Sequence, residues 1–436
     1  MTSPTSPNRP TSGTGLTSET ISSGEPGSFP WSVFHRRHPE LVRQLLDALP
    51  YGPAERAAVA SLLTESTSGA GLAPLPPEAA DAERWRSWGA ERWYGRPWAE
   101  VPFLWAESYF YRRLLEATGY FRPGAWQGID PFGPVKAAEL AGPEVTAELA
   151  ALDELPALEP ERRERALLRS ALWGNRADLS FRLTAGADGG TDGGDGGTDS
   201  DGGTDGGGGT GREPLVDESA LLRSALAVAP RPRVSYVADN AGRELLPDLV
   251  LIEHLLGSGV AEVLLHVKPY PYYVSDATTA DVLAALDRLL RAGSAQAERI
   301  GGRLRAALSD GRLVLHTHPF FSAPLPFEEL PTDLRAVFAA ATVTIVKGDL
   351  NYRRLVGDRR WPPTTPFAAR VAHFPGPVAA LRTLKSEVVV GLDAATVNRL
   401  DATGEGWRTS GTYAVLQVAG VTGTAGTVRA AGAAGA

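Results

Sequence analysis

The chain has 436 residues, a formal net charge of −8 at pH 7 and no cysteine. Apolar residues make up 43% and charged residues 22%, which is the composition of a soluble globular protein of one large domain or two smaller ones. The acidic balance offers no concentrated basic face for nucleic acid. The lack of cysteine excludes disulfides, thiolate metal sites and a cysteine nucleophile. No run of about 18 apolar residues occurs, so we expect no membrane partner and no membrane-spanning helix.

The two ends of the chain are rich in small and polar residues. Residues 1–30 are dominated by Ser, Thr, Pro and Gly and lack the apolar region of a signal peptide. Neither this segment nor residues 419–436 can bury enough apolar surface to offset its ordering entropy, so both are predicted to be disordered tails. The absence of a signal peptide and of cysteine predicts a cytoplasmic protein.

Helical spacing prevails in the first half of the chain. Apolar residues three and four positions apart recur over 38–49, 54–63 and 106–121, which predicts an N-terminal all-helical domain over residues 31–185. A Gly/Asp-rich tract follows at 186–212, and its composition is typical of a flexible loop.

Short apolar runs alternate with helical segments after this tract. We expect strands at 233–239, 261–267, 312–318, 342–349 and 386–392. Strands that alternate with helices predict an α/β domain over residues 213–418, with a Rossmann-like, mostly parallel sheet covered by helices on both faces. Ligands of such sheets bind beyond the carboxyl ends of the strands.

Polar and charged side chains stand at these strand ends. They are Asp239 and Asn240 after the first strand, Asp276 a short loop beyond the second, and Lys347, Asp349, Asn351 and Arg353 after the fourth. Carboxylate and amide oxygens are ligands that magnesium and manganese prefer, and the cations suit phosphate oxygens. Each group alone is also typical of a helix N-cap or a solvated turn, but their joint occurrence favours a metal and phosphate site.

His316 and His318 share one face at the end of the third expected strand, a spacing also found in zinc sites. No further histidine completes the set in the sequence, so a core or supporting role is favoured.

Three segments carry a resemblance to a known family. Residues 239–251 (DNAGRELLPDLVL), residues 347–367 (KGDLNYRRLVGDRRWPPTTPF) and Arg382–Lys385 (RTLK) resemble the metal-dependent damage-control phosphatases, first catalogued as domain of unknown function 89. The Arg-Thr-x-Lys element is similar to that of their third subfamily, which includes a protein also described as a glutamate methyltransferase. The resemblance covers nearly all of residues 31–418 apart from the Gly/Asp tract.

The resemblance implies roles for individual residues. Asp239, Asn240 and Asp276 match the metal ligands and catalytic groups of the family. The implied substrate-binding residues are Asp349, Leu350, Asn351, Tyr352, Arg353, Arg382 and Lys385, with Lys347 and Gly348 in a K-G-x-x-N element. Gly174, Asn175 and Asp178 occupy the place of a G-N-x-x-E element, with Asp for Glu. Glu244 falls where the methyltransferase account places its cofactor, and Glu107 is a further candidate for the same pocket.

The function that this implies is hydrolysis of small sugar phosphates, such as fructose 1-phosphate or fructose 6-phosphate, for metabolite damage control. The expected cofactor is Mn²⁺ or Mg²⁺, with Co²⁺ or Ni²⁺ sharing the same ligands. Either Asp239 forms an aspartyl-phosphate or a metal-bound water attacks. Two alternatives are S-adenosylmethionine-dependent glutamate O-methylation and a non-catalytic phosphosugar-binding module. The loop after the first strand has a single glycine, whereas methyltransferases of the Rossmann class usually place a Gly-rich loop there.

Overall fold

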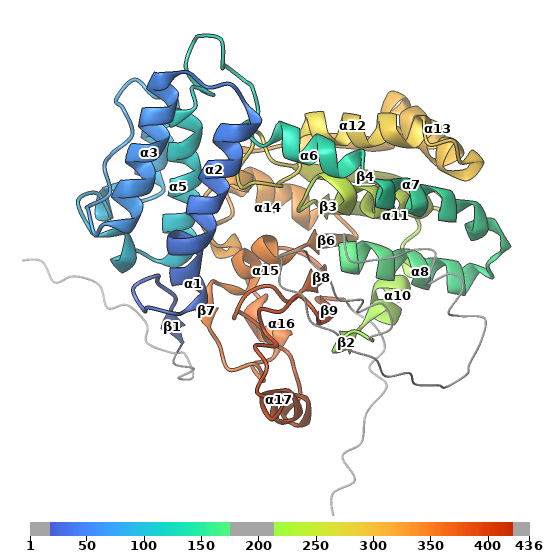
Figure 1. The fold of residues 1–436 in the computed structure, drawn as a ribbon. Helices are drawn as coiled ribbons and strands as arrows, with labels where there is room; N and C mark the ends of the chain where they lie inside the picture. The colour runs from blue at the N-terminus through green and yellow to red at the C-terminus, as the bar shows by residue number, and fades with distance from the viewer. Residues whose placement is uncertain (1–17, 175–212, 422–436) are drawn as a thin grey trace, which may run out of the picture.

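A seven-stranded sheet forms the centre of the protein, with the strand order β2-β9-β8-β6-β3-β4-β5. The computed structural model describes residues 18–174 and 213–421, so the Gly/Asp tract and the outer parts of both predicted tails lie outside the described residues (Figure 1). The strands are β2 (Val216–Asp217), β3 (Arg233–Val237), β4 (Glu262–Val267), β5 (Leu313–Thr317), β6 (Val343–Lys347), β8 (Val378–Thr383) and β9 (Ala414–Ala419).

The sheet is mostly parallel, which confirms the predicted fold class. Strands β3, β4, β5, β6 and β8 pair in parallel, and β9 runs antiparallel to β8. Strand β3 pairs with β4 on one side and with β6 on the other, with Val237 opposite Val346. The chain therefore leaves β3 in one direction and later returns to its other side. In open α/β sheets, ligands commonly bind at such a reversal, beyond the carboxyl ends of the two strands, which are here β3 and β6.

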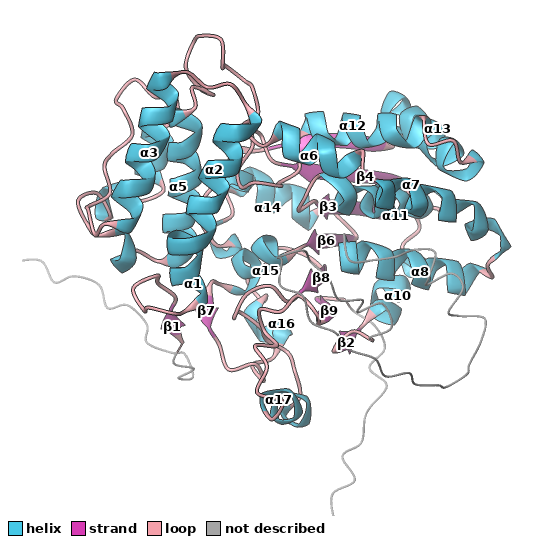
Figure 2. Cartoon of the chain, viewed as in Figure 1, coloured by secondary structure: helices cyan, strands magenta, loops and turns pink. Residues whose placement is uncertain are grey.

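Helices cover both faces of this sheet (Figure 2). One face carries α7 (Pro143–Ala151), α8 (Pro160–Trp173), α10 (Ser219–Val228), α11 (Leu245–Gly257), α12 (Thr279–Leu290) and α13 (Ala295–Asp310). The other carries α14 (Thr332–Ala339), α15 (Asp349–Val356) and α16 (Phe367–Arg370). On β3, the side chains of Val234 and Tyr236 pack in the core under α7 to α13, and that of Val237 packs in the core under α14 to α16. Burial on both faces explains why the strands read as continuous apolar runs.

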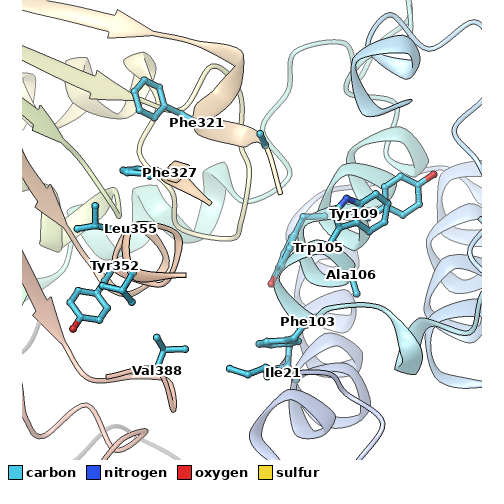
Figure 3. Packing of buried hydrophobic residues seen from close by; sticks show 14 of the residues in the cluster. Ile21, Phe103, Trp105, Ala106, Tyr109, Phe321, Phe327, Tyr352, Leu355 and Val388 are labelled. Carbon is cyan, nitrogen blue, oxygen red and sulfur yellow. The ribbon is translucent and has the colours of Figure 1, made fainter. Parts of the chain in front are cut away.

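An aromatic-rich bundle packs against the second face. Its helices are α1 (Phe29–Ser32), α2 (His38–Ala48), α3 (Pro53–Thr67), α4 (Ala82–Ser87) and α5 (Phe103–Ala117). Figure 3 shows Ile21 and Phe103 on the bundle side of the core, and Tyr352 and Leu355 of α15 on the sheet side. Two short helices stand apart from these layers: α6 (Gly133–Leu140), between the bundle and α12, and α17 (Ala394–Asp401).

The folded chain begins before the predicted boundary at residue 30. Strand β1 (Glu19–Thr20) pairs antiparallel with β7 (Arg359–Arg360), and Ile21 is only 4% exposed. The predicted helical domain is also divided, because α7 and α8 bury Val145 and Leu168 in the same core as β3. Helical spacing predicts which face of a helix is buried, but not the surface that covers it.

One predicted strand, residues 386–392, is wrong. Val388, Val389 and Val390 are fully buried but form no strand. Side chains satisfy this backbone instead, because Gln417 Nε2 donates to Val390 O at 2.8 Å and Arg382 donates to Val388 O. The strands in this part of the chain are β8 and β9.

Arg354 links α15 to the loop that follows β5. Its guanidinium is fully buried and donates to the carbonyl oxygens of Phe320 at 2.7 Å, Leu325 at 2.8 Å and Phe321 at 3.2 Å. The group also lies 4.6 Å from the ring centroid of Phe320. This single side chain therefore supplies donors to several buried carbonyls.

We expect Arg354→Met to lower the free energy of unfolding by roughly 3 kcal/mol or more, because three buried acceptors lose their donors. Urea unfolding measures the change. The matched control is Arg291→Met, which removes a 77% exposed side chain paired with Asp287 on α12 and should cost less than about 0.5 kcal/mol. Equal effects of the two substitutions would contradict this role of Arg354.

Candidate functional site

Asp239 and Gly348 meet where β3 and β6 end. Asp239 is 6% exposed, and Gly348 has a positive φ of +88°. A Cβ on Gly348 would lie 1.9 Å from Oδ2 of Asp239. Only glycine allows this approach, because both the backbone conformation and the space exclude a side chain.

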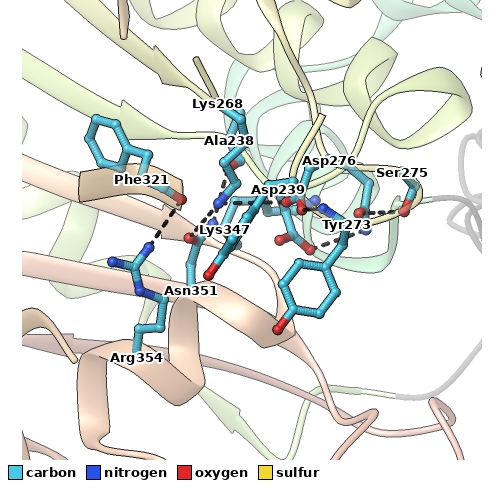
Figure 4. Close-up of polar contacts among 12 residues, drawn as sticks. Ala238, Asp239, Lys268, Tyr273, Ser275, Asp276, Phe321, Lys347, Asn351 and Arg354 are labelled. Carbon is cyan, nitrogen blue, oxygen red and sulfur yellow. Dashed lines mark hydrogen bonds and ion pairs between the residues drawn. The ribbon is translucent and has the colours of Figure 1, made fainter. Parts of the chain in front are cut away.

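The loop after β3 pairs with the loop that carries Asp276. The carbonyl oxygen of Asp239 accepts from Ala277 N at 2.9 Å, and that of Ser275 accepts from Ala241 N at 2.6 Å. These hydrogen bonds hold Asp239 and Asp276 at the same edge of the sheet (Figure 4).

Asn240 joins the two loops through its side chain. Its Nδ2 donates to Asp239 Oδ2 at 3.1 Å and to Glu244 Oε2 at 2.9 Å. Its Oδ1 accepts from the hydroxyl of Ser275 at 2.8 Å. The structure therefore brings together the three residues for which the sequence predicts a metal site.

The buried charges at this edge do not balance. Four buried carboxyl groups, of Asp239, Glu244, Asp248 and Asp276, lie beside the buried ammonium groups of Lys268 and Lys347. A third buried ammonium, of Lys136, contacts the Asp276 backbone but is itself paired with Asp130 and Asp281. Burial, reinforced by the charges of Glu244 and Asp276, raises the pKa of Asp239 well above its usual range. The excess negative charge and the available oxygens fit a hard divalent cation. In the described part of the chain, no three His, Asp or Glu side chains form a metal cluster alone, so the amide oxygen of Asn240 would complete the set.

Lys347 is held beneath the site by carboxylates. Its Nζ lies 3.0 Å from Glu244 Oε1 and 3.3 Å from Asp248 Oδ1. Burial alone would raise the pKa of Glu244, but Lys347 and Lys385 lower it to about 2. Gly174, from the end of α8, packs directly on this residue, since a Cβ there would lie 2.7 Å from Glu244 Cγ.

Asp349 organises the opposite rim at the start of α15. Its Oδ1 accepts from Arg382 Nε at 2.8 Å, Ser386 Oγ at 3.1 Å and Lys385 N at 3.2 Å. Arg382 is fully buried. The Lys385 ammonium is 38% exposed and lies 4.0 Å from the nearest oxygen of Glu244. Lys385 is thus the accessible cation on this rim.

The other predicted residues of α15 divide between core and site. The hydroxyl of Tyr352 donates to Gln417 Oε1 at 2.9 Å and the residue is fully buried, so its side chain belongs to the core. Leu350 is half-buried. Asn351 Nδ2 donates to Ala238 O at 3.0 Å and to Lys347 O at 2.8 Å. Asn351 therefore cross-links the ends of β3 and β6.

Arg353 connects the sheet to the helical bundle. Asp358 binds its guanidinium with two hydrogen bonds of 2.7 and 3.0 Å, and Glu107 of α5 lies 3.6 Å away. Oε2 of Glu107 is buried without a hydrogen-bond partner. Burial, partly offset by Arg353, raises the pKa of Glu107 to about 7.

Comparison with known proteins identifies the family. The family model of the damage-control phosphatase ARMT1-like domain matches residues 33–400. The chain belongs to this family. Relatives named damage-control phosphatase ARMT1 include those of Danio rerio (28% identical, covering 92% of this chain and 97% of the relative), Xenopus laevis (29%, 91% and 98%) and Homo sapiens (27%, 92% and 98%). A solved DUF89 family protein from Pyrococcus horikoshii aligns with 84% of this chain and 94% of its own, at 14% identity and a TM-score of 0.43.

The remaining predicted residues of this ARMT1-like chain are two of the G-N-x-x-E element and two histidines. Asn175 and Asp178 lie outside the described residues. His316 faces His266 across β4 and β5, with 3.1 Å between their Nδ1 atoms, and His318 pairs with Asp333. None of the described helices is long and apolar enough to cross a membrane.

Sequence reasoning missed two buried lysines. Lys268, 2% exposed, directly follows β4, lying 3.4 Å from Asn351 Oδ1 and 3.5 Å from Asp276 Oδ1. Lys136 of α6 donates to the backbone oxygen of Asp276 at 2.9 Å, and to Asp130 and Asp281 at 3.0 Å. The signal for Lys268 was present, because it stands at a strand end like Asp239. Lys136 lies on α6, far in sequence from the strand ends, so no local pattern indicated its role.

Because the carboxyl group of Glu107 is buried, we expect it to make the stability of the protein depend on pH. Its pKa rises from 4.5 to about 7 on folding, so the native carboxylate is disfavoured and stability falls as the pH rises between these values. Glutamine does not ionise. We therefore expect Glu107→Gln to match the native protein in stability near pH 4.5 and to exceed it by up to about 3 kcal/mol above pH 7. Urea midpoints at several pH values measure the difference, and a difference independent of pH would contradict the assignment.

Proposed function

We propose that the chain is a metal-dependent phosphatase that hydrolyses small sugar phosphates in metabolite damage control. The observation that carries the proposal is the pair of buried carboxyl groups, Asp239 and Asp276, on paired loops beyond the carboxyl ends of β3 and β4. Membership of a family of damage-control phosphatases supports the same activity.

A divalent ion would be held by Asp239, Asp276 and the amide of Asn240. Mn²⁺ and Mg²⁺ suit these ligands, as do Co²⁺ and Ni²⁺. When bound, such an ion polarises the phosphoryl group and offsets negative charge as the ester breaks. The excess of buried carboxyl groups over ammonium groups supports the need for a metal ion. Without that added positive charge, the site would repel a phosphate dianion.

The reaction is the transfer of the phosphoryl group to water. A P–O bond to the water oxygen forms and the P–O bond to the sugar breaks, and the proton from water ends on the sugar oxygen. Asp349 holds Arg382 and the Lys385 backbone, and the accessible Lys385 ammonium is placed to orient the phosphate. The first N–H groups of α15 have no intrahelical acceptor and would be available to the same anion.

The sugar would lie toward the helical bundle. Glu107 offers a buried oxygen without a hydrogen-bond partner, and Arg353 supplies a cation beside it. A hydroxyl of a fructose 1-phosphate or fructose 6-phosphate type substrate would satisfy that oxygen, since a buried acceptor that lacks a hydrogen bond is costly. This pairing supports a polyhydroxylated substrate.

Methyl transfer has less support from the geometry. Both oxygens of Glu244, the residue aligned with cofactor binding, are engaged by Asn240 and Lys347. The loop after β3 is occupied by its pairing with the Asp276 loop, where a Rossmann-class methyltransferase would need room for its cofactor.

Release of inorganic phosphate from a panel of sugar phosphates tests the proposal. We expect release by the native protein with Mn²⁺, loss of release with a chelator, and recovery when the metal is restored. Asp239→Asn keeps the size of the side chain but removes its charge, so it should behave like the chelated enzyme. No release from any sugar phosphate by folded, manganese-supplied native protein would sink the proposal.

Gly348→Ala tests the approach of the two strand ends. The added Cβ displaces Asp239, and a misplaced catalytic group costs about 100-fold in kcat/KM. Gly311→Ala is the matched control, because Gly311 has a similar φ of +80° with nothing within 4 Å. Gly311→Ala should lose about 1–2 kcal/mol of stability from left-handed backbone strain. Gly348→Ala should lose more, because its φ of 88° and ψ of 173° are nearly restricted to glycine and its Cβ meets Asp239. Only Gly348→Ala should lose activity. Equal activity in the two variants would contradict the geometric role.

A further inference from the structure

Most cations predicted to grip phosphate are already committed to protein acceptors. Lys347 is bound by Glu244 and Asp248, and Asp358 takes two donors of Arg353. Arg382 donates to Asp349, to Ser386 and to a backbone carbonyl. Their hydrogen bonds position the site, but leave few donors for a ligand. The phosphate must be recognised by other groups as well.

Lys268, which the sequence did not single out, differs from these buried cations. Its ammonium is 1% exposed, yet its contacts in the described residues are long: 3.4 Å to Asn351 Oδ1 and 3.5 Å to Asp276 Oδ1. The ring centroid of Tyr272 is 5.6 Å away. An ammonium group has three N–H donors, and burial without close acceptors is costly. By comparison, Lys136 has three acceptors at 2.9–3.0 Å.

We propose that Lys268 is a further catalytic residue, whose ammonium binds an oxygen of the phosphoryl group. The inference rests on the proposed phosphatase function. Lys268 lies between Asp276, a metal ligand in that function, and Asn351 in the first turn of α15 (Figure 4). A phosphoryl group between the metal and this helix would meet the ammonium and supply the close acceptor that it lacks.

A role as a simple counter-ion for Asp276 explains the arrangement less well. The Asp276 carboxylate already accepts from Tyr273 N at 2.7 Å, and its backbone oxygen is held by Lys136. A fixed cation beside metal ligands also repels the incoming metal. This repulsion weakens metal binding, so we expect such a cation only where it also binds an anionic ligand. Preorganised sites that stabilise charge during a reaction are of this kind.

Two equilibrium measurements separate these roles, and each uses the whole protein. Mn²⁺ affinity is measured by electron paramagnetic resonance, and phosphate binding by the inhibition constant of inorganic phosphate at saturating Mn²⁺. For Lys268→Met we expect Mn²⁺ to bind as tightly as in the native protein or more tightly, while the phosphate constant weakens at least tenfold. Loss of one such charge stabiliser should lower kcat/KM about 100-fold. Lys268→Arg retains the charge and should recover part of the phosphate binding.

The outcomes distinguish this inference from the function on which it rests. If the native protein neither binds Mn²⁺ nor releases phosphate, the proposed function fails. If the native protein does both, but Lys268→Met keeps native phosphate inhibition, the role of Lys268 is refuted. Weaker Mn²⁺ binding with unchanged phosphate inhibition would make Lys268 a positioning residue for Asp276 and also overturn the proposal. Should Lys268→Met unfold, Lys268→Gln takes its place in the same measurements.

Discussion

The close approach of Gly348 to the carboxylate of Asp239 is the contact on which the rest of the site depends. It occurs just beyond the carboxyl ends of the adjacent parallel strands β3 and β6, where the order of strands along the chain reverses. Asn351 reinforces it by bonding both strand ends from the first turn of α15. Since both strands are buried on both faces, the contact is held by the whole core.

The helical bundle is joined to this site through the loop that carries Asp276. Ser108 of α5 accepts from the hydroxyl of Tyr272 at 2.6 Å and lies 3.2 Å from that of Tyr273. Glu107, one residue earlier, faces Arg353 of α15. Neighbouring residues of one helix therefore contact both rims. The bundle therefore borders the proposed site, and a substrate held by α5 would also contact the elements that carry Asp239 and Asp276.

Much of the site could be predicted from the sequence because parallel strands bring their carboxyl ends to one edge. This rule placed Asp239, Asn240 and Asp276 together, and the structure confirms that they meet. The same rule applied to Lys268, but a lysine in a loop is usually solvated and its burial depends on the bundle, which no local pattern reveals. The apolar run at 386–392 misled for a related reason. Two of its backbone carbonyls accept hydrogen bonds from side chains and not from another strand. Gln417 is distant in sequence, and Arg382 also donates to Asp349.

In the proposed function, Asp239 and Asp276 form a metal site that faces a phosphate beyond the carboxyl ends of β3 and β6. The most direct test is a crystal structure with Mn²⁺ and inorganic phosphate, using anomalous scattering at the manganese edge. We expect one strong peak ligated by both carboxylates and by the amide oxygen of Asn240, with phosphate beside it at the start of α15. A manganese peak elsewhere in the molecule, or none at saturating metal, would contradict it.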